Sequence, residues 1–223
     1  MNKLSMLFTF IFILGWANVS HAANFFLDEP EFGRDLSIPY QAADSYNRAL
    51  GFWKTAEDIN KWIAASFVYD KERAIKLSSD QRTKNKGISI YNPSEFFENK
   101  TGVCVDLARF CVETLRIIDP NSEPKYLMIE FDPIQINSHT FRLHWLVSFK
   151  RGGMKYFFGD SKRPGYISGP YNSTQVFISE YEKYRGRKIV THRELESYQK
   201  ERKSKSLKGR AIKDLNKPDE ADR

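Results

Sequence analysis

The chain has 223 residues, of which 41% are hydrophobic, and a formal net charge of +7. Residues 23–181 carry 20 Lys plus Arg against 20 Asp plus Glu, whereas residues 182–223 carry 14 against 8, so the positive charge is concentrated at the C-terminal end. A charge distributed in this way does not indicate a nucleic-acid-binding fold. The length predicts one domain with a sizeable core, and the sequence contains no internal repeats.

A signal peptide is predicted at residues 1–22. Lys3 provides a short basic region, residues 6–16 form an almost unbroken apolar run, and Ser20-His21-Ala22 offers small residues at the two positions that a signal peptidase reads. The apolar run is shorter than the roughly 20 residues that span a bilayer, which favours cleavage before Ala23 over an uncleaved membrane anchor. We therefore expect a periplasmic or secreted protein with no transmembrane segment after cleavage.

Two capped helices are predicted in the N-terminal half of the domain. Thr55 and Asp58 form a capping-box pattern that is followed by apolar residues at helical spacing. Asn92, Pro93 and Glu95 supply a cap residue, a proline at the first helical position and a glutamate that closes a second capping box. The apolar positions of the first helix are Ile59, Trp62, Ile63 and Phe67.

A third helix is predicted to begin at Cys104, two residues after Gly102. A helix start supplies unpaired N–H groups and a partial positive charge, which lower the pKa of a thiol below its usual value of about 8.5 and favour the reactive thiolate. Cys104 is therefore predicted to be a nucleophile that points toward the core. The apolar positions that continue its helical period are Leu107, Ala108, Cys111, Leu115 and Ile118.

Cys104 and Cys111 are predicted to be free thiols, although disulfides are common in exported proteins. Seven residues along a helix span about 10 Å, which exceeds the Cα separation of roughly 7 Å that a disulfide tolerates. Cys111 is expected to be a small core residue.

Period-two patterns predict three strands, at residues 125–131, 141–150 and 154–158. If Arg151-Gly152-Gly153 forms a three-residue hairpin loop, His144 lies directly opposite Asp160, and their Cβ atoms are about 5 Å apart. A two-residue loop would pair His144 with Ser161 instead.

Together these residues have the chemistry of nucleophilic catalysis. A neutral His144 ring can accept the proton of Cys104, and Asp160 on the far ring nitrogen would fix the tautomer and orientation of the ring. His139 could compete for the role of base, but Trp145 and the hairpin register favour His144. The sequence therefore predicts a catalytic triad of Cys104, His144 and Asp160.

Three segments together resemble the transglutaminase-like superfamily, including the bacterial transglutaminase-like cysteine peptidases. The segments are Gly102–Ala108 (Gly-Val-Cys-Val-Asp-Leu-Ala), His144–Phe149 and Tyr156–Asp160. Both the order Cys, His, Asp and the spacing from His to Asp are similar to the family pattern. The resemblance covers about residues 55–164. It implies an α+β, papain-like core in which N-terminal helices, including the helix that bears Cys104, pack on an antiparallel sheet.

The oxyanion hole is the part of the site that the resemblance leaves open. The Cys104 backbone N–H is one expected donor, and relatives often supply a second from a side chain upstream of the cysteine. Tyr91 is the first candidate, with Gln81 and Trp53 behind it, and a core aromatic is the alternative role for Tyr91. Asp106 is expected to be a structural carboxylate in the first helical turn. No cofactor and no metal site are expected, because the cysteines and histidines match no ligand spacing.

The resemblance implies an exported enzyme that attacks an amide carbonyl of a protein or peptide and forms a thioester. Hydrolysis of the thioester by water would make the protein a cysteine peptidase or amidase. A transamidase, in which an amine resolves the same thioester, and a non-catalytic interaction module are the alternatives. The domain is expected at residues 23–195. Residues 196–223 are expected to form a basic, disordered tail that is solvated or contacts anionic surfaces.

Overall fold

The computed structural model describes residues 28–40, 42–80, 87–136 and 139–199. The predicted signal peptide with its cleavage site, and nearly all of the predicted basic tail, lie outside these residues, so both stay predictions. Among the helices of the described residues, none combines the length and the apolar composition needed to cross a membrane.

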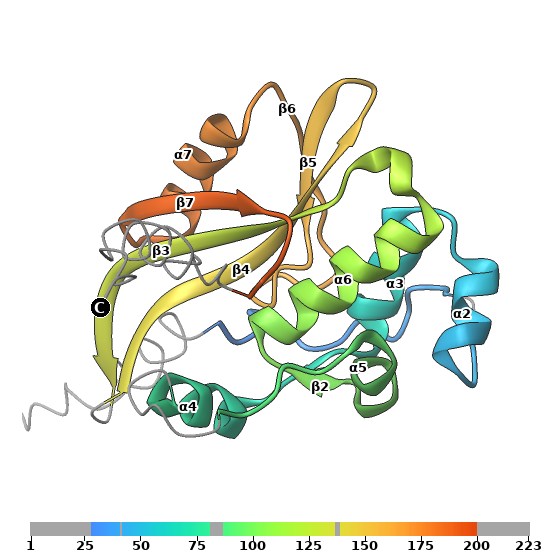
Figure 1. The fold of residues 1–223 in the computed structure, drawn as a ribbon, viewed down its shortest axis with the longest axis horizontal. Coiled ribbons are helices and arrows are strands. Elements are labelled where there is room, and N and C mark those ends of the chain that lie inside the picture. The colour runs from blue at the N-terminus through green and yellow to red at the C-terminus, as the bar shows by residue number, and fades with distance from the viewer. Residues whose placement is uncertain (1–27, 41, 81–86, 137–138, 200–223) are drawn as a thin grey trace, which may run out of the picture.

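A five-stranded antiparallel sheet with the strand order β6-β5-β4-β3-β7 forms the centre of the structure (Figure 1). Its strands are β3 (Lys125–Ile136), β4 (His139–Arg151), β5 (Met154–Phe158), β6 (Ser168–Tyr171) and β7 (Ile189–Leu195). Two further short strands, β1 (Val68–Tyr69) and β2 (Thr101–Gly102), pair in parallel. The helices are α2 (Tyr46–Phe52), α3 (Ala56–Ser66), α4 (Lys71–Asp80), α5 (Pro93–Asn99), α6 (Cys104–Ile118), the 3₁₀ turn η1 (Pro120–Ser122) and α7 (Thr174–Arg185). The α+β fold is as predicted.

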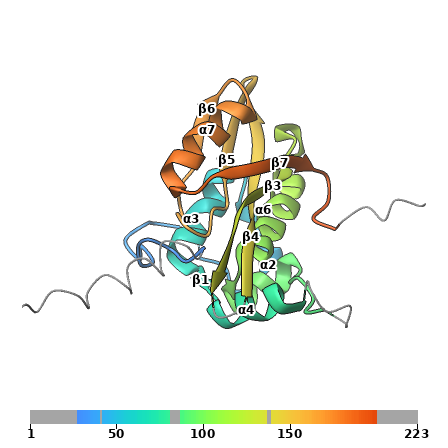
Figure 2. The ribbon, with the colours of Figure 1, turned by 90° about the vertical axis from the view of Figure 1, so that its left-hand side faces the viewer.

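Helices cover both faces of the sheet. Figure 2 shows α7 on one side of the sheet and α6 on the other. Because successive strand residues point to opposite faces, each central strand contributes to two separate cores. The core under α2, α3, α5 and α6 takes Tyr126, Val147, Phe149 and Phe158 from the sheet. The core under α7 takes Leu127, Ile129, Phe131, Leu146 and Phe157.

The predicted helix starts are confirmed. The Thr55 backbone N–H donates to Asp58 over 3.1 Å at the start of α3. At the start of α5, the Asn92 side chain accepts from the Glu95 N–H over 3.0 Å, and Glu95 accepts from the Asn92 N–H over 2.8 Å. Helix α6 begins at Cys104. Local capping chemistry therefore accounts for the starts of α3 and α5.

The predicted three-residue loop of the β4–β5 hairpin is wrong. Arg151 pairs with Met154, so the loop consists of Gly152 and Gly153 alone, with φ of 58° and 77°. A two-residue loop with positive φ at both positions matches the twist of the flanking strands, and glycine adopts this conformation without strain.

The corrected register would place His144 opposite Ser161, but the strand pairing ends before that point, at Phe158. Gly159 follows with φ of 70° and turns the chain. A Cβ atom at Gly159 would lie 3.1 Å from the Cys111 sulfur, so only glycine allows this close approach to α6. This turn at Gly159, and not the hairpin register, brings Asp160 to His144.

Candidate active site

Cys104 is the first residue of α6 and follows the short strand β2. The parallel pairing of Tyr69 with Gly102 holds the chain just before the helix. Cys104 is 8% exposed, and both it and Cys111 are free thiols, as predicted. In β4, the Trp145 backbone N–H faces the Cys104 thiol and acts to lower its pKa.

Asp106 holds the start of α6 in place. One carboxylate oxygen accepts from the Val103 backbone N–H over 3.0 Å and from Arg73 Nε over 2.7 Å. The other accepts from Arg73 Nη2 over 2.8 Å and from the Tyr91 backbone N–H over 2.9 Å. A Cβ atom at Gly102 would lie 3.0 Å from the Asp106 Cβ, so glycine is needed beside this carboxylate. These contacts agree with the structural role expected for Asp106, and the buried arginine is an addition that the sequence did not reveal.

His144 lies fully buried between Cys104 and Asp160. Its Nε2 is 3.2 Å from Asp160 Oδ1. The Cys104 sulfur and a His144 ring nitrogen lie within 4.8 Å of each other. Because Asp160 engages Nε2, Nδ1 is the nitrogen left to face Cys104. The structure thus brings the three predicted triad residues together.

Asp160 is held by several donors. Its Oδ1 accepts from the Lys162 backbone N–H over 2.9 Å, and its Oδ2 accepts from the Tyr181 hydroxyl over 3.0 Å. Burial alone would raise the pKa of Asp160, but His144 and the arginines Arg185 and Arg163 lower it to about 2. The side chain is therefore ionised at neutral pH and stabilises a positively charged imidazole.

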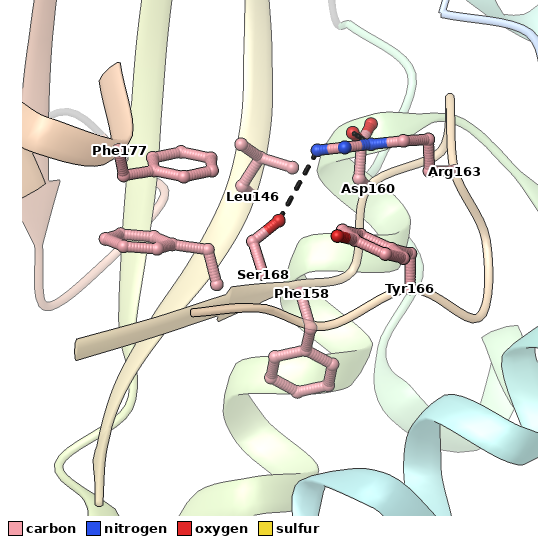
Figure 3. A pocket seen from close by; sticks show the side chains of 8 residues that line it. Leu146, Phe158, Asp160, Arg163, Tyr166, Ser168 and Phe177 are labelled. Atoms are coloured by element: carbon pink, nitrogen blue, oxygen red, sulfur yellow. Dashed lines mark hydrogen bonds and ion pairs between the residues drawn. The ribbon is translucent and has the colours of Figure 1, made fainter. Parts of the chain in front are cut away.

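A small pocket lies beside Asp160 (Figure 3). The Arg163 side chain crosses it, with Nε 3.4 Å from Asp160 Oδ2 and Nη2 3.5 Å from the Ser168 hydroxyl. The other lining residues are Leu146, Phe157, Phe158, Tyr166 and Phe177. The pocket has no room for a water molecule, so its lining side chains keep solvent away from the Asp160 carboxylate.

The predicted lowering of the Cys104 pKa is wrong for this structure. Burial raises the pKa of the thiol, and the negative charge of Asp28 raises it further, whereas His144 and the Trp145 N–H act in the opposite direction. Desolvation therefore outweighs the effect of the helix start, and the resting thiol is protonated at neutral pH.

Asp28 is a fourth residue of the site, and no sequence pattern indicated it. Its Oδ2 lies 3.0 Å from His144 Nδ1, off the direction of an aligned hydrogen bond, and its Oδ1 accepts from Arg185 Nη2 over 2.7 Å. The ligand atoms of Asp28, Cys104 and His144 lie within 4.8 Å of one another, which is close enough to hold a metal ion. The Arg185 cation on the same carboxylate opposes the binding of a second cation there.

Tyr69 also lies near the nucleophile. Burial, followed by the negative charge of Asp28, raises its pKa well above the usual value. Its hydroxyl therefore stays protonated and is available as a hydrogen-bond donor.

The other sequence candidates lie as follows. Tyr91 stacks under the Arg73 guanidinium, 3.8 Å from the ring centroid, and its role in an oxyanion hole stays a prediction. Trp53 is 2% exposed and packs among the aromatic rings of the helical core, which indicates a structural role. Gln81 lies outside the described residues. His139 is the first residue of β4 and pairs with Ile136 near the hairpin end, while His144 is the histidine that meets Asp160.

We expect His144 to be positively charged at neutral pH. Burial alone would lower its pKa, but the charge of Asp28 and the hydrogen bond to Asp160 raise it well above the usual value. Because the folded-state pKa lies above the unfolded one, these contacts stabilise the fold fully below about pH 6.5, and the contribution is lost as the pH rises through the folded pKa. NMR titration of the ring C–H proton, assigned with His144→Gln, measures the pKa. Asp28→Asn should lower it, and a wild-type midpoint at or below the ordinary value contradicts the expectation.

A comparison with family models matches residues 49–186, more than half of the chain, to the family described as "Transglutaminase-like domain". A search of curated proteins found no match. The matched residues include Cys104, His144 and Asp160, whereas Asp28 lies before the matched region.

Proposed function

Because the chain belongs to the transglutaminase-like domain family, we propose that it is a Cys-His-Asp enzyme that cleaves amide bonds in proteins or peptides through a thioester. The position of His144 carries the proposal. The ring has no exposed surface, one nitrogen is 3.2 Å from Asp160, and a ring nitrogen lies within 4.8 Å of the Cys104 sulfur. A base held between a nucleophile and an orienting carboxylate is the arrangement that nucleophilic catalysis requires.

The proposed reaction begins from the neutral form of the His144 ring. The Cys104 sulfur attacks the amide carbonyl carbon, and its proton passes to His144 Nδ1. Asp160 meanwhile holds the Nε2–H and stabilises the imidazolium. The intermediate collapses when Nδ1 gives the proton to the leaving nitrogen, so that the C–N bond breaks and the thioester remains. Water then attacks the thioester carbonyl, His144 takes a proton from the water, and this proton returns to the sulfur as the carboxylic acid leaves.

The products formed from a peptide library show whether water or an amine accepts the acyl group of the thioester. We expect the full chain to yield new peptide termini or free acids, and Cys104→Ala to abolish them. Cys111→Ala is the matched control, because Cys111 is a fully buried thiol of the same helix that touches no reacting group, and it should leave the products unchanged. A labelled primary amine is included in every reaction. Incorporation of the amine in place of hydrolysis would indicate a transamidase, and the absence of any Cys104-dependent product would indicate an interaction module.

A further inference from the structure

A carboxylate of the chain itself lies where a substrate must bind. Asp28 belongs to a segment far from Cys104 in sequence, yet its carboxylate oxygen lies within 4.8 Å of both the Cys104 sulfur and a His144 ring nitrogen. An amide carbonyl that is attacked by the thiol has to approach this same volume. With Asp28 in place, the nucleophile is therefore covered by the N-terminal segment.

Arg185 is the group that holds this carboxylate. The side chain is 1% exposed, its Nη2 donates to Asp28 over 2.7 Å, and its Nη1 donates to the Tyr181 hydroxyl over 2.9 Å. The Nε of Arg185 is buried without a hydrogen-bond partner. A guanidinium buried this deeply requires a counter-charge, so any arrangement that removes Asp28 must bring another anion to Arg185.

Further positive charge surrounds the same carboxylate. Arg187 is 8% exposed, and burial together with the repulsion from Arg185 lowers its pKa to about 10 despite the attraction of Asp28. Burial and Arg185 also lower the pKa of the nearby Lys162. Asp160 balances part of this charge, but it is committed to His144. The volume that Asp28 occupies is therefore a cationic one, suited to a carboxylate.

The segment that carries Asp28 has no regular secondary structure and is joined to the rest of the fold by few backbone hydrogen bonds. Residues 28–40 contain no helix or strand. Backbone hydrogen bonds join Glu31 to Lys162 and Asp35 to Ala64, and Glu29 pairs with the exposed Lys71. Two large apolar side chains of the segment, Phe32 and Leu36, are 78% and 76% exposed. Segments with exposed apolar groups and few backbone bonds open at low cost relative to global unfolding.

Asp28 also opposes the first chemical step. A carboxylate beside Nδ1 favours a protonated imidazole, which cannot accept the Cys104 proton, and it disfavours a thiolate on the neighbouring sulfur. The arrangement with Asp28 bound is therefore a resting state, and its departure both uncovers the thiol and releases the base.

We propose that Arg185 forms a carboxylate-binding subsite beside Cys104, that the chain's own Asp28 fills it as a tethered inhibitor, and that substrates carry an acidic side chain next to the reacting amide. The proposal rests on the amide-cleaving function proposed above and names its substrate class. Because Asp28 is tethered, it competes at an effective concentration in the millimolar range for a short flexible connection. A substrate must displace it, and its apparent affinity is reduced by the fraction of molecules in the filled state.

The first test measures how fast iodoacetamide alkylates Cys104, read by mass spectrometry of the Cys104 peptide. Loss of a charge-assisted contact shifts the equilibrium between the covered and uncovered states of Cys104 by about tenfold. The Asp28→Ala and Asp28→Asn variants should therefore be alkylated about tenfold faster than the wild-type chain. Asp35→Ala is the matched control, because Asp35 is an exposed residue of the same segment whose carboxylate accepts hydrogen bonds from the N–H and hydroxyl of the neighbouring Ser37. Equal or slower alkylation of both Asp28 variants overturns the inhibitory role.

The second test measures binding without catalysis, by calorimetry in a Cys104→Ser background. N-acetyl-aspartate methylamide and N-acetyl-asparagine methylamide form the probe pair, since they differ only in charge. In the Asp28→Ala variant, the acid should bind at least about tenfold more tightly than the amide. In the chain that retains Asp28, the acid should bind about tenfold more weakly than it binds to the Asp28→Ala variant. Arg185→Met should remove the preference. Where that variant fails to fold, Arg185→Lys should weaken acid binding but retain part of it.

The outcomes separate this inference from the proposed function. Equal binding of acid and amide overturns the subsite even where peptides are hydrolysed. Tight acid binding without Cys104-dependent hydrolysis leaves the subsite standing and overturns the enzyme assignment. Binding of the acid at a site unaffected by Arg185→Met and Arg185→Lys also overturns the subsite.

Discussion

Asp160→Asn is expected to lower kcat/KM for amide hydrolysis by about 10²–10⁴-fold, the range over which a positioned acid–base group contributes. The Lys162 backbone N–H donates to Oδ1 over 2.9 Å, so an asparagine oxygen can keep that place and still accept from His144. The substitution then removes the negative charge while the geometry stays. Steady-state kinetics on a cleaved peptide measure the loss, and it should appear mainly in kcat because the imidazolium forms during the reaction.

Tyr181→Phe is the matched control for Asp160→Asn. The Tyr181 hydroxyl donates to Oδ2, the oxygen that faces away from His144, over 3.0 Å. Removing it weakens the support of the carboxylate without removing its charge, so we expect a smaller loss, on the order of tenfold. If Asp160→Asn retains nearly full kcat while circular dichroism shows a native fold, Asp160 has no role in the reaction.

Asp106→Ala is expected to lower the free energy of unfolding by about 3–5 kcal/mol, because it leaves a buried arginine without its counter-charge. The Arg73 side chain is 8% exposed and gives two hydrogen bonds to Asp106, whose side chain is fully buried. The same substitution removes the acceptor of the Val103 N–H at the start of α6. Urea unfolding followed by circular dichroism measures the change.

The double variant Arg73→Met/Asp106→Ala tests the cause. Removing both charges takes away the uncompensated cation, so the double variant should be more stable than Asp106→Ala alone. Asp35→Ala, which removes an exposed carboxylate, should change the stability little. A loss below about 1 kcal/mol for Asp106→Ala would mean that Arg73 finds water when its partner is gone.

Local patterns were sufficient to predict the helix starts. The capping residues at Thr55 and Asn92 act within one turn, so a single sequence contains the whole signal. The hairpin loop was not determined in this way, because alternation along β4 and β5 is compatible with either loop length. The prediction of a contact between His144 and Asp160 succeeded for a different physical reason, the positive φ of Gly159.

Long-range contacts were beyond the reach of the sequence. Asp28 and Arg185 are separated by 157 positions and neither belongs to a recognisable motif. The count of basic residues includes Arg185 and Arg187 in the positive charge of residues 182–223 but does not distinguish buried from exposed side chains, and both are buried in the structure. The prediction of a lowered Cys104 pKa failed for a similar reason. The position of Cys104 at a helix start is a local property, whereas its burial depends on the whole fold.

The contact between Cys111 and Gly159 sets the spacing of the two halves of the site. Cys111 lies two turns along α6 from Cys104, and its sulfur fills the space against the turn that presents Asp160. The distance between nucleophile and carboxylate therefore depends on the thickness of one small side chain that takes no part in the chemistry. A larger side chain at position 111 would push α6 away from the sheet and increase the distance between Cys104 and Asp160. Smaller side chains can therefore be accommodated at this position, whereas larger ones separate the residues of the triad.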